Sequence, residues 1–430
     1  MITPSAYPLS FFLRPLQRPF PLCCTLIVLA GLLPLAPTSF AENLTSLGAT
    51  PDWSELDSLQ HTMTYSDFRW LLETQYAPFG AWHDYIELHA GYALIKIAPD
   101  SSDATYQLHF KASTAPAKET RLRPLSDLHI TLDPGHIGGD FAVVEQRSWQ
   151  LEGGPLIREG DLVLELALRL KPELEALGAT VSLTRTANRP VTQAPPASLL
   201  PKAEAWLQRQ PTGLPGLPQA DATLSPELKA KQLHDLSELL FYRVSEIQSR
   251  AHLINETLQP DIVLALHINA AAFPPVPGKN LVQENHLHVL INGAYSQAEL
   301  AYDDQRHAML IKLLNRSWEI ERALGTCLAH GLATTTQLPP FTYHGHNAIR
   351  VNTSHCLWAR NLLANRSYRC PVIFLEPYIA NSEVVYPRLV AVIEKDTDPQ
   401  QPDILDEYIA GILQGLHQYS KNQSPHESCD

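Results

Sequence analysis

Short apolar runs alternate with amphipathic or polar segments along most of the sequence after residue 126. Runs this short fit strands that are buried on both faces better than they fit helices. Strands that alternate with helices are typical of an α/β domain, because parallel neighbours in a sheet need a long crossover between them. We therefore predict a mostly parallel, twisted sheet flanked by helices. The predicted strands are His129–Leu132, Thr180–Thr184, Ile262–Leu266, Leu287–Ile291 and Val372–Leu375.

The segments between these strands predict several helices. Val163, Leu166, Leu170 and Leu174 form one apolar stripe of a helix that should stop at Gly178. Residues 187–224 are rich in Pro, Ala and Gln and read as a long excursion. Further helices are expected from Ser225-Pro226 to Leu258, over 305–330 and over 403–418.

The first 41 residues have the pattern of a secretory signal. Arg14 and Arg18 precede an apolar run that is followed by Ser39-Phe40-Ala41. A basic segment, a short apolar core and small residues predict export with cleavage after Ala41, and we expect a periplasmic protein. The run is shorter than the ~20 residues that span a bilayer, and no later segment is apolar enough to span one.

The charge and the cysteines limit the partners and the metal chemistry. The formal net charge is −13, from 32 basic and 45 acidic side chains, which argues against nucleic acid or an anionic membrane as partner. Cys327, Cys356, Cys370 and Cys429 remain after export, and one or two disulfides are allowed. Because no two of these cysteines have CxxC spacing, a cysteine zinc site is not expected.

The chain divides into a small and a large unit. Residues 42–125 predict a small α+β domain. In this domain Ser66 could cap a short helix. Three short stretches in which apolar and polar residues alternate predict a meander of strands. Residues 126–420 form the main domain, with insertions near 187–224 and 271–345, and 421–430 are a tail. Aromatic side chains in the small domain are expected to fill its core rather than to stack on sugars.

Three predicted strands each end in a side chain that can bind a metal or transfer a proton. His136 follows the first strand in the stretch LDPGH, His267 follows Leu266, and Glu376 follows Leu375. In open α/β sheets functional groups gather beyond the carboxyl ends of strands. A zinc hydrolase needs three protein ligands and one open position for water. Two histidines are then in place, and a carboxylate is the expected third ligand.

Several residues compete for the remaining roles. Glu159 opens the amphipathic helix and is a candidate third ligand, with Glu152 and Glu145 as rivals that lie nearer His136 in sequence. Asp133 is a candidate for orienting a ligating imidazole, although it also suits the Asp-Pro-Gly turn. The pairs His286/His288 and His344/His346 have no carboxylate beside them and are expected to be ordinary strand and loop residues.

Five blocks together resemble a known family. LDPGHIGGD, REGDLVLELALRL, VSLTR, ALHINA and FLEPYIAN, in this order, are similar to the type-3 catalytic domain of zinc-dependent N-acetylmuramoyl-L-alanine amidases, over about 128–415. The resemblance implies a zinc amidase or exopeptidase-like fold and peptidoglycan as substrate. It implies that His136, Glu159 and His267 bind Zn²⁺ and that Glu376 is the catalytic glutamate. It thereby favours Glu159 over Glu152.

The sequence also departs from this family. Ile137 stands where a glycine is usual, residues 142–158 form an added loop that should rim the site, and a long insertion follows His267. The insertions could form an inhibitory element or dock a regulatory protein. Two other readings stay open. One is a zinc exopeptidase or deacetylase that acts on another cell-wall substrate. The other is a non-catalytic protein that binds peptidoglycan or regulates its turnover.

Overall fold

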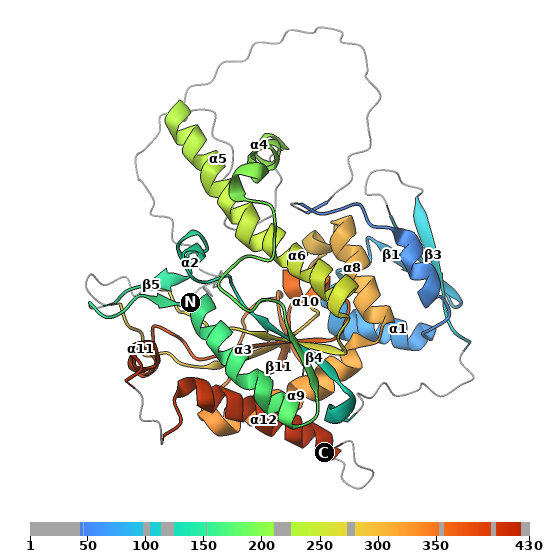
Figure 1. Cartoon of the computed structure of the whole chain (residues 1–430). Coiled ribbons are helices and arrows are strands. Elements are labelled where there is room, and N and C mark those ends of the chain that lie inside the picture. The colour runs from blue at the N-terminus through green and yellow to red at the C-terminus, as the bar shows by residue number, and fades with distance from the viewer. Residues whose placement is uncertain are drawn as a thin grey trace, which may run out of the picture.

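A seven-stranded sheet forms the centre of the molecule (Figure 1). The computed structural model describes residues 44–45, 47–97, 104–112, 124–151, 153–209, 225–272, 280–351, 357–396 and 401–422. The predicted signal peptide and residues 423–430 of the predicted tail lie outside these ranges, as does the rival ligand Glu152.

The strand order of this sheet is β10-β11-β9-β12-β8-β4-β7. The pairs β7–β4, β4–β8, β8–β12 and β9–β11 are parallel, and β12–β9 and β10–β11 are antiparallel. The prediction of a mostly parallel sheet is confirmed. The strands are β4 (His129–Pro134), β7 (Thr180–Leu183), β8 (Ile262–Leu266), β9 (Leu287–Ile291), β10 (Ile349–Arg350), β11 (Leu357–Ala359) and β12 (Val372–Pro377).

Helices cover both faces of the sheet. Along β8, Leu264 and Leu266 belong to the large core, whereas Val263 and Ala265 belong to a second cluster on the opposite face. This alternation is the two-residue period of a strand that is buried on both sides. The large core includes α3 (Glu159–Ala176), α8 (Asp303–Leu314), α9 (Ser317–Thr336) and α12 (Ile404–Asn422), and the second cluster includes α6 (Glu246–His252) and α10 (Leu363–Ser367).

Two predicted helices are confirmed with changes at their ends. In α3 the stripe of Val163, Leu166, Leu170 and Leu174 is buried, and Gly178 follows with φ +93°. The C-terminal helix α12 ends at Asn422, four residues further than predicted. The remaining short helices are α2 (Phe141–Val144), α7 (Gln297–Leu300) and α11 (Tyr386–Glu394), and four 3-10 turns span Trp53–Leu59, Pro78–Gly80, Leu125–Asp127 and Pro196–Leu199.

The helix predicted over 305–330 is two helices. The break lies at Arg316, whose φ of +57° is left-handed and cannot continue an α-helix. The prediction for Ser225 is confirmed, since its side chain accepts a hydrogen bond from Leu228 N and Pro226 follows as the first residue of α5 (Pro226–Leu240). The helical path goes on to Leu258 through α6 and two π-helical segments, Phe241–Ser245 and Leu253–Leu258.

The N-terminal part combines a helix and a small sheet. Thr64, rather than Ser66, caps α1 (Tyr65–Leu71), because its side chain accepts from Asp67 N; a π-helical segment, Leu72–Tyr76, follows. The predicted meander is confirmed as the antiparallel sheet β1 (Ile86–Leu88), β2 (Tyr92–Lys96) and β3 (Thr105–His109). Its buried side chains are continuous with the large core.

The predicted excursion over residues 187–224 contains a helix, α4 (Leu200–Arg209), and is followed by α5. α4 and α5 extend from one side of the molecule (Figure 1). Apolar side chains of both helices pack with Ile137, the residue after His136. No disulfide joins Cys327 and Cys370 to each other, and Cys356 and Cys429 lie outside the described residues. No described helix is both long and apolar enough to cross a membrane.

Candidate metal centre

Three candidate metal-ligating side chains meet beyond the carboxyl ends of β4 and β8. These strands are parallel neighbours, with Pro134 beside Leu266, so His136 and His267 follow adjacent points of the sheet edge. Glu159 is the first residue of α3 and reaches both imidazoles. Its Oε2 lies 3.2 Å from Nε2 of His136, and its Oε1 lies 3.2 Å from Nδ1 of His267. One ligand atom of each residue lies within 4.8 Å of the other two.

This donor set fits zinc. Two imidazole nitrogens and one carboxylate oxygen are a common set in catalytic zinc sites, which leave a further position for water. The side chains of His136 and His267 are 18% and 15% exposed, and that of Glu159 is 4% exposed, so the cluster is shielded but reachable. Within the described ranges, this is the one His, Cys, Asp or Glu group with such spacing.

The charges of the three side chains depend on one another. Burial alone would raise the pKa of Glu159, but the two imidazoles outweigh it and hold that pKa well below its usual value. Burial opposes the charged form of His136, yet the carboxylates of Glu159 and Glu145 raise its pKa to about 9. Burial lowers the pKa of His267, so its imidazole favours the neutral form. The site therefore contains an ionised carboxylate between two imidazoles.

Glu145 contacts the second nitrogen of the His136 ring. Its Oε1 lies 3.4 Å from Nδ1 of His136, and its carboxylate accepts hydrogen bonds from the backbone N–H groups of Ile137 and Gly138 at 2.9 and 3.2 Å. A carboxylate at Nδ1 favours the tautomer whose Nε2 is free to bind a metal. Glu145, considered from the sequence as a rival ligand, is thus placed to orient the candidate ligand His136.

Asp133 lies elsewhere than predicted. Its carboxylate accepts hydrogen bonds from the hydroxyl groups of Thr184 (2.6 Å) and Tyr368 (2.7 Å) and pairs with Arg250 (2.9 Å). Of the two roles considered for Asp133, direct contact with a candidate ligating imidazole is not among these contacts. Its place at the end of a buried strand, beside a buried cation, explains why the chain has an acid there.

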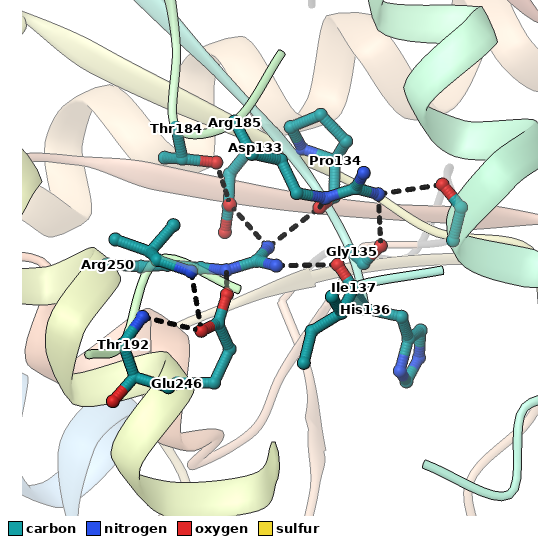
Figure 2. A network of polar contacts seen from close by, with 12 residues as sticks. Asp133, Pro134, Gly135, His136, Ile137, Thr184, Arg185, Thr192, Glu246 and Arg250 are labelled. Atoms are coloured by element: carbon teal, nitrogen blue, oxygen red, sulfur yellow. Dashed lines mark hydrogen bonds and ion pairs between the residues drawn. The ribbon is translucent and has the colours of Figure 1, made fainter. Parts of the chain in front are cut away.

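Arg250 holds the turn that carries His136. Its guanidinium donates to the carbonyl oxygens of Pro134 (2.7 Å) and His136 (2.5 Å), and its Nε donates to Glu246. Figure 2 shows the guanidinium in the middle of this network, with the imidazole of His136 pointing away from it. His136 has a φ of +56°, which is uncommon for a residue with a side chain, and these bonds hold it there.

Arg185 joins the turn to the start of α3. Its guanidinium donates to the carbonyl oxygens of Pro134 (3.2 Å) and Gly135 (3.1 Å) (Figure 2). It also donates to the carbonyl oxygen of Gly160 at 2.7 Å. Gly135 precedes His136, and Gly160 follows Glu159. One buried side chain thus fixes the backbone beside two candidate ligands.

Glu376 lies at the end of β12, the strand next to β8, with Leu375 beside Leu266. The residue is partly buried. Burial, reinforced by the negative charge of Glu159, raises its pKa to about 8, although Arg147 and Arg360 oppose the shift. A carboxyl with such a pKa can both take up and release a proton near neutral pH, as general acid–base catalysis requires.

Arg147 is a site residue that the sequence did not reveal. Its Nε lies 3.3 Å from Nε2 of His136 and 3.6 Å from Oε2 of Glu159. It belongs to the added loop of residues 142–158, where β5 (Ser148–Trp149) pairs with β6 (Ile157–Arg158). Its backbone carbonyl accepts from Glu159 N at 3.2 Å, which ties the loop to α3. An arginine in a loop gives no sequence signal of such a contact.

Comparison with protein-family models finds no match to this sequence, and comparison with curated proteins finds none either. Among solved structures, the chain is similar to the N-acetylmuramyl-L-alanine amidase Ami1 from Mycobacterium smegmatis. That likeness has 16% identity and a TM-score of 0.36, and it covers 70% of this chain and 100% of the other.

Two other solved structures are similar to the chain. The CwlD amidase from Clostridioides difficile, in complex with the GerS lipoprotein, has 14% identity and a TM-score of 0.36, over 69% of this chain and 99% of CwlD. The catalytic domain of CwlV, an N-acetylmuramoyl-L-alanine amidase from Bacillus (Paenibacillus) polymyxa, has 13% identity and a TM-score of 0.34, over 68% and 98%.

Proposed function

We propose that this chain is an exported, zinc-dependent hydrolase that cleaves the amide bond between N-acetylmuramic acid and L-alanine in peptidoglycan. The observation that carries the proposal is the cluster of His136, Glu159 and His267, whose ligand atoms lie within 4.8 Å of one another, with Glu376 at the end of the adjacent strand. The sequence blocks that contain these residues resemble those of type-3 amidases.

The chain's own residues supply the proton transfers. Zinc, when bound, polarises the amide carbonyl and lowers the pKa of water toward ~7. Glu376 accepts the proton of the attacking water and then returns it to the nitrogen of the departing L-alanine. With its pKa raised by burial to about 8, its conjugate acid is stable enough to make that return. Glu145 keeps Nε2 of His136 available as a ligand.

Export and partner form part of the same proposal. The pattern of Arg14, Arg18, an apolar run and Ala41 supports export to the periplasm, where peptidoglycan is the partner of the mature chain. Docking of a regulatory protein on the insertions is the remaining element. Its proposed place is α4, which lies within the insertion at 187–224 and packs with Ile137 beside the site.

The test is mass spectrometry of soluble products from purified peptidoglycan. The mature protein, from Glu42, is loaded with one equivalent of zinc and compared with Glu376→Gln and with a chelator-treated sample. We expect free stem peptides that begin with L-alanine from the loaded protein and from neither control.

Other products would overturn the proposal in informative ways. Peptides cut at another bond, or sugars that have lost acetyl groups, would keep the metal site and assign a different reaction. Absence of any product, with protein that still sediments with peptidoglycan, would favour the non-catalytic reading.

A further inference from the structure

A cluster of polar and aromatic side chains lies beside Glu376 on the neighbouring strand. His288 of β9 stands directly opposite Glu376 of β12 in an antiparallel register. Directly opposed residues of antiparallel strands project from the same face, with Cβ atoms ~5 Å apart. Phe374, two residues before Glu376, shares this face and stacks on the ring of His267 at 4.3 Å. The cluster is therefore continuous with the candidate metal centre.

Asn269 fixes which nitrogen of His288 carries the proton. The amide oxygen of Asn269 accepts from the backbone N–H of Ala270 at 2.8 Å, so its NH₂ group faces His288, with Nδ2 3.1 Å from Nε2. An amide nitrogen only donates, and Nε2 must therefore accept. Nδ1 of His286, 2.9 Å from the same Nε2, is consistent with this as a second donor. Burial lowers the pKa of His288 to about 3, so the ring is neutral and its hydrogen is on Nδ1.

This hydrogen determines the direction of the next bond. Nδ1 of His288 lies 2.8 Å from the hydroxyl oxygen of Tyr343, which must accept from it. The hydroxyl hydrogen of Tyr343 is then left to donate, and among the residues that the structure describes no acceptor for it is found. Burial and the negative charge of Glu376 raise the pKa of Tyr343, so the hydroxyl stays protonated.

Packing holds the tyrosine ring in place. Phe341 lies against Tyr343 at 4.8 Å between ring centroids, and Trp358 does so at 5.3 Å, both edge to face. The guanidinium of Arg360 stands 5.5 Å from the centre of the ring. A donor on a ring fixed in this way loses little conformational entropy when it binds a ligand oxygen.

We propose that the Tyr343 hydroxyl is a catalytic hydrogen-bond donor to the carbonyl oxygen of the scissile amide, and that His288 and Asn269 are the residues that position it. The role rests on the proposed function, because the substrate is the amide that Glu376 helps to hydrolyse. The donor forms and breaks no covalent bond. It stabilises the negative charge that develops on that oxygen as water adds to the carbonyl carbon.

The first test measures turnover of N-acetylmuramoyl-L-alanyl-D-isoglutamine by zinc-loaded variants. Tyr343→Phe keeps the ring and removes the donor, and we expect kcat to fall about 100-fold with KM changed less than threefold. His288→Leu should lower kcat about 10-fold. His288→Asn should keep it within threefold, because its amide can replace the Nδ1–H donor. The double variant His288→Leu/Tyr343→Phe should be no worse than Tyr343→Phe.

Zinc content and zinc affinity, measured by chelator competition, should be unchanged in all of these variants, which separates a donor role from damage to the metal centre. The matched control is Tyr106→Phe in strand β3 of the small sheet. It removes a hydroxyl that is hydrogen-bonded to Asp57, and it should keep full turnover. A Tyr343→Phe variant with normal zinc affinity and kcat within twofold of the parent would overturn the proposal.

A second readout does not depend on activity. In ¹⁵N-histidine-labelled protein, the signals lost in His288→Asn should show Nε2 without a hydrogen and Nδ1 with one. The opposite tautomer would overturn the positioning by Asn269 whatever the enzyme does. If the parent protein cleaves no peptidoglycan and no soluble substrate, the proposed function and the role of Tyr343 at this bond fail together, while the tautomer still decides the orientation of the hydroxyl.

Discussion

Gly160 and Gly138 lie in backbone contact, because a Cβ atom on Gly160 would stand 2.4 Å from the backbone nitrogen of Gly138. The first residue follows Glu159 in α3, and the second lies two residues after His136. The two segments that carry these candidate ligands can therefore approach only because both positions lack a side chain.

Gly160→Ala should separate His136 from Glu159. A Cβ at this distance must push the turn away from α3, since the atom it meets is backbone. We expect zinc affinity to fall at least 10-fold, measured by competition with a chromophoric chelator. Gly91→Ala is the control, because a Cβ there has no atom within 4 Å, and it should leave the affinity unchanged. Equal affinities for the two variants would contradict this close packing as a requirement of the site.

Each candidate ligand should be needed for stoichiometric zinc. His136→Ala, Glu159→Gln and His267→Ala each remove one of three donors, and we expect at least a 100-fold loss of affinity and loss of hydrolysis. Zinc per chain, measured by inductively coupled plasma mass spectrometry after dialysis, checks this. His234→Ala removes an imidazole that is 63% exposed on α5 and should retain one zinc per chain. Retention of zinc by Glu159→Gln would assign the third donor to another residue.

Glu376→Gln should stabilise the metal-free protein at high pH only. The pKa of Glu376 is raised from 4.5 to about 8 in the folded protein, so folding is disfavoured progressively as the pH rises through this window. Glutamine has no charge and avoids the penalty. We expect the variant to be ~4 kcal/mol more stable than the parent at pH 8 and equal to it below pH ~4. Urea unfolding in the presence of a chelator measures the free energy of unfolding of parent and variant at each pH. A difference that is the same at every pH would show that the raised pKa of Glu376 is not its cause.

Lys312 of α8 and Glu321 of α9 form a buried ion pair. Both side chains are 0% exposed, and Nζ lies 2.7 Å from Oε1. Lys312→Met should destabilise the fold by ~3–5 kcal/mol, because it leaves a buried carboxylate unpaired.

A double variant separates the effect of the two charges from the effect of the side-chain volumes. Lys312→Met/Glu321→Leu should regain part of the stability that Lys312→Met loses in urea unfolding. The exposed pair Lys231–Asp235 is the control, and Lys231→Met should change stability by less than ~1 kcal/mol. A double variant less stable than Lys312→Met would show that the pair itself does not account for the loss.

The sheet could be predicted from the sequence, and so could the grouping of the residues that follow its strands at one edge. Apolar runs such as Ile262–Leu266 are periodic and local, and the residue that follows a buried strand must lie at the sheet edge. The break at Arg316 was not predicted, because apolar residues continue on both sides of it and only a left-handed φ interrupts the helix.

The residues around the candidate ligands were harder to predict. Arg185 and Arg250 act through contacts between segments far apart in the chain, such as the bond from Arg250 to the carbonyl oxygen of His136. A charge on a helix or in a loop most often faces solvent, so the pattern of these residues carries no sign of burial. His288 looked like an ordinary strand residue for the same reason. Its position beside the candidate site follows from its pairing with Glu376 across two strands, which the sequence does not show.

The two arginines that hold the His136 turn have a consequence for the order of events in the life of the protein. Their donors are bonded to carbonyl oxygens and carboxylates of the chain itself. The binding geometry therefore belongs to the folded polypeptide, and a metal ion would add stability by mass action alone, in proportion to the logarithm of its free concentration. Such a chain can fold before it binds a metal ion. In a compartment where free zinc rises and falls, the supply of the ion would then set the active fraction while the amount of folded protein stays constant.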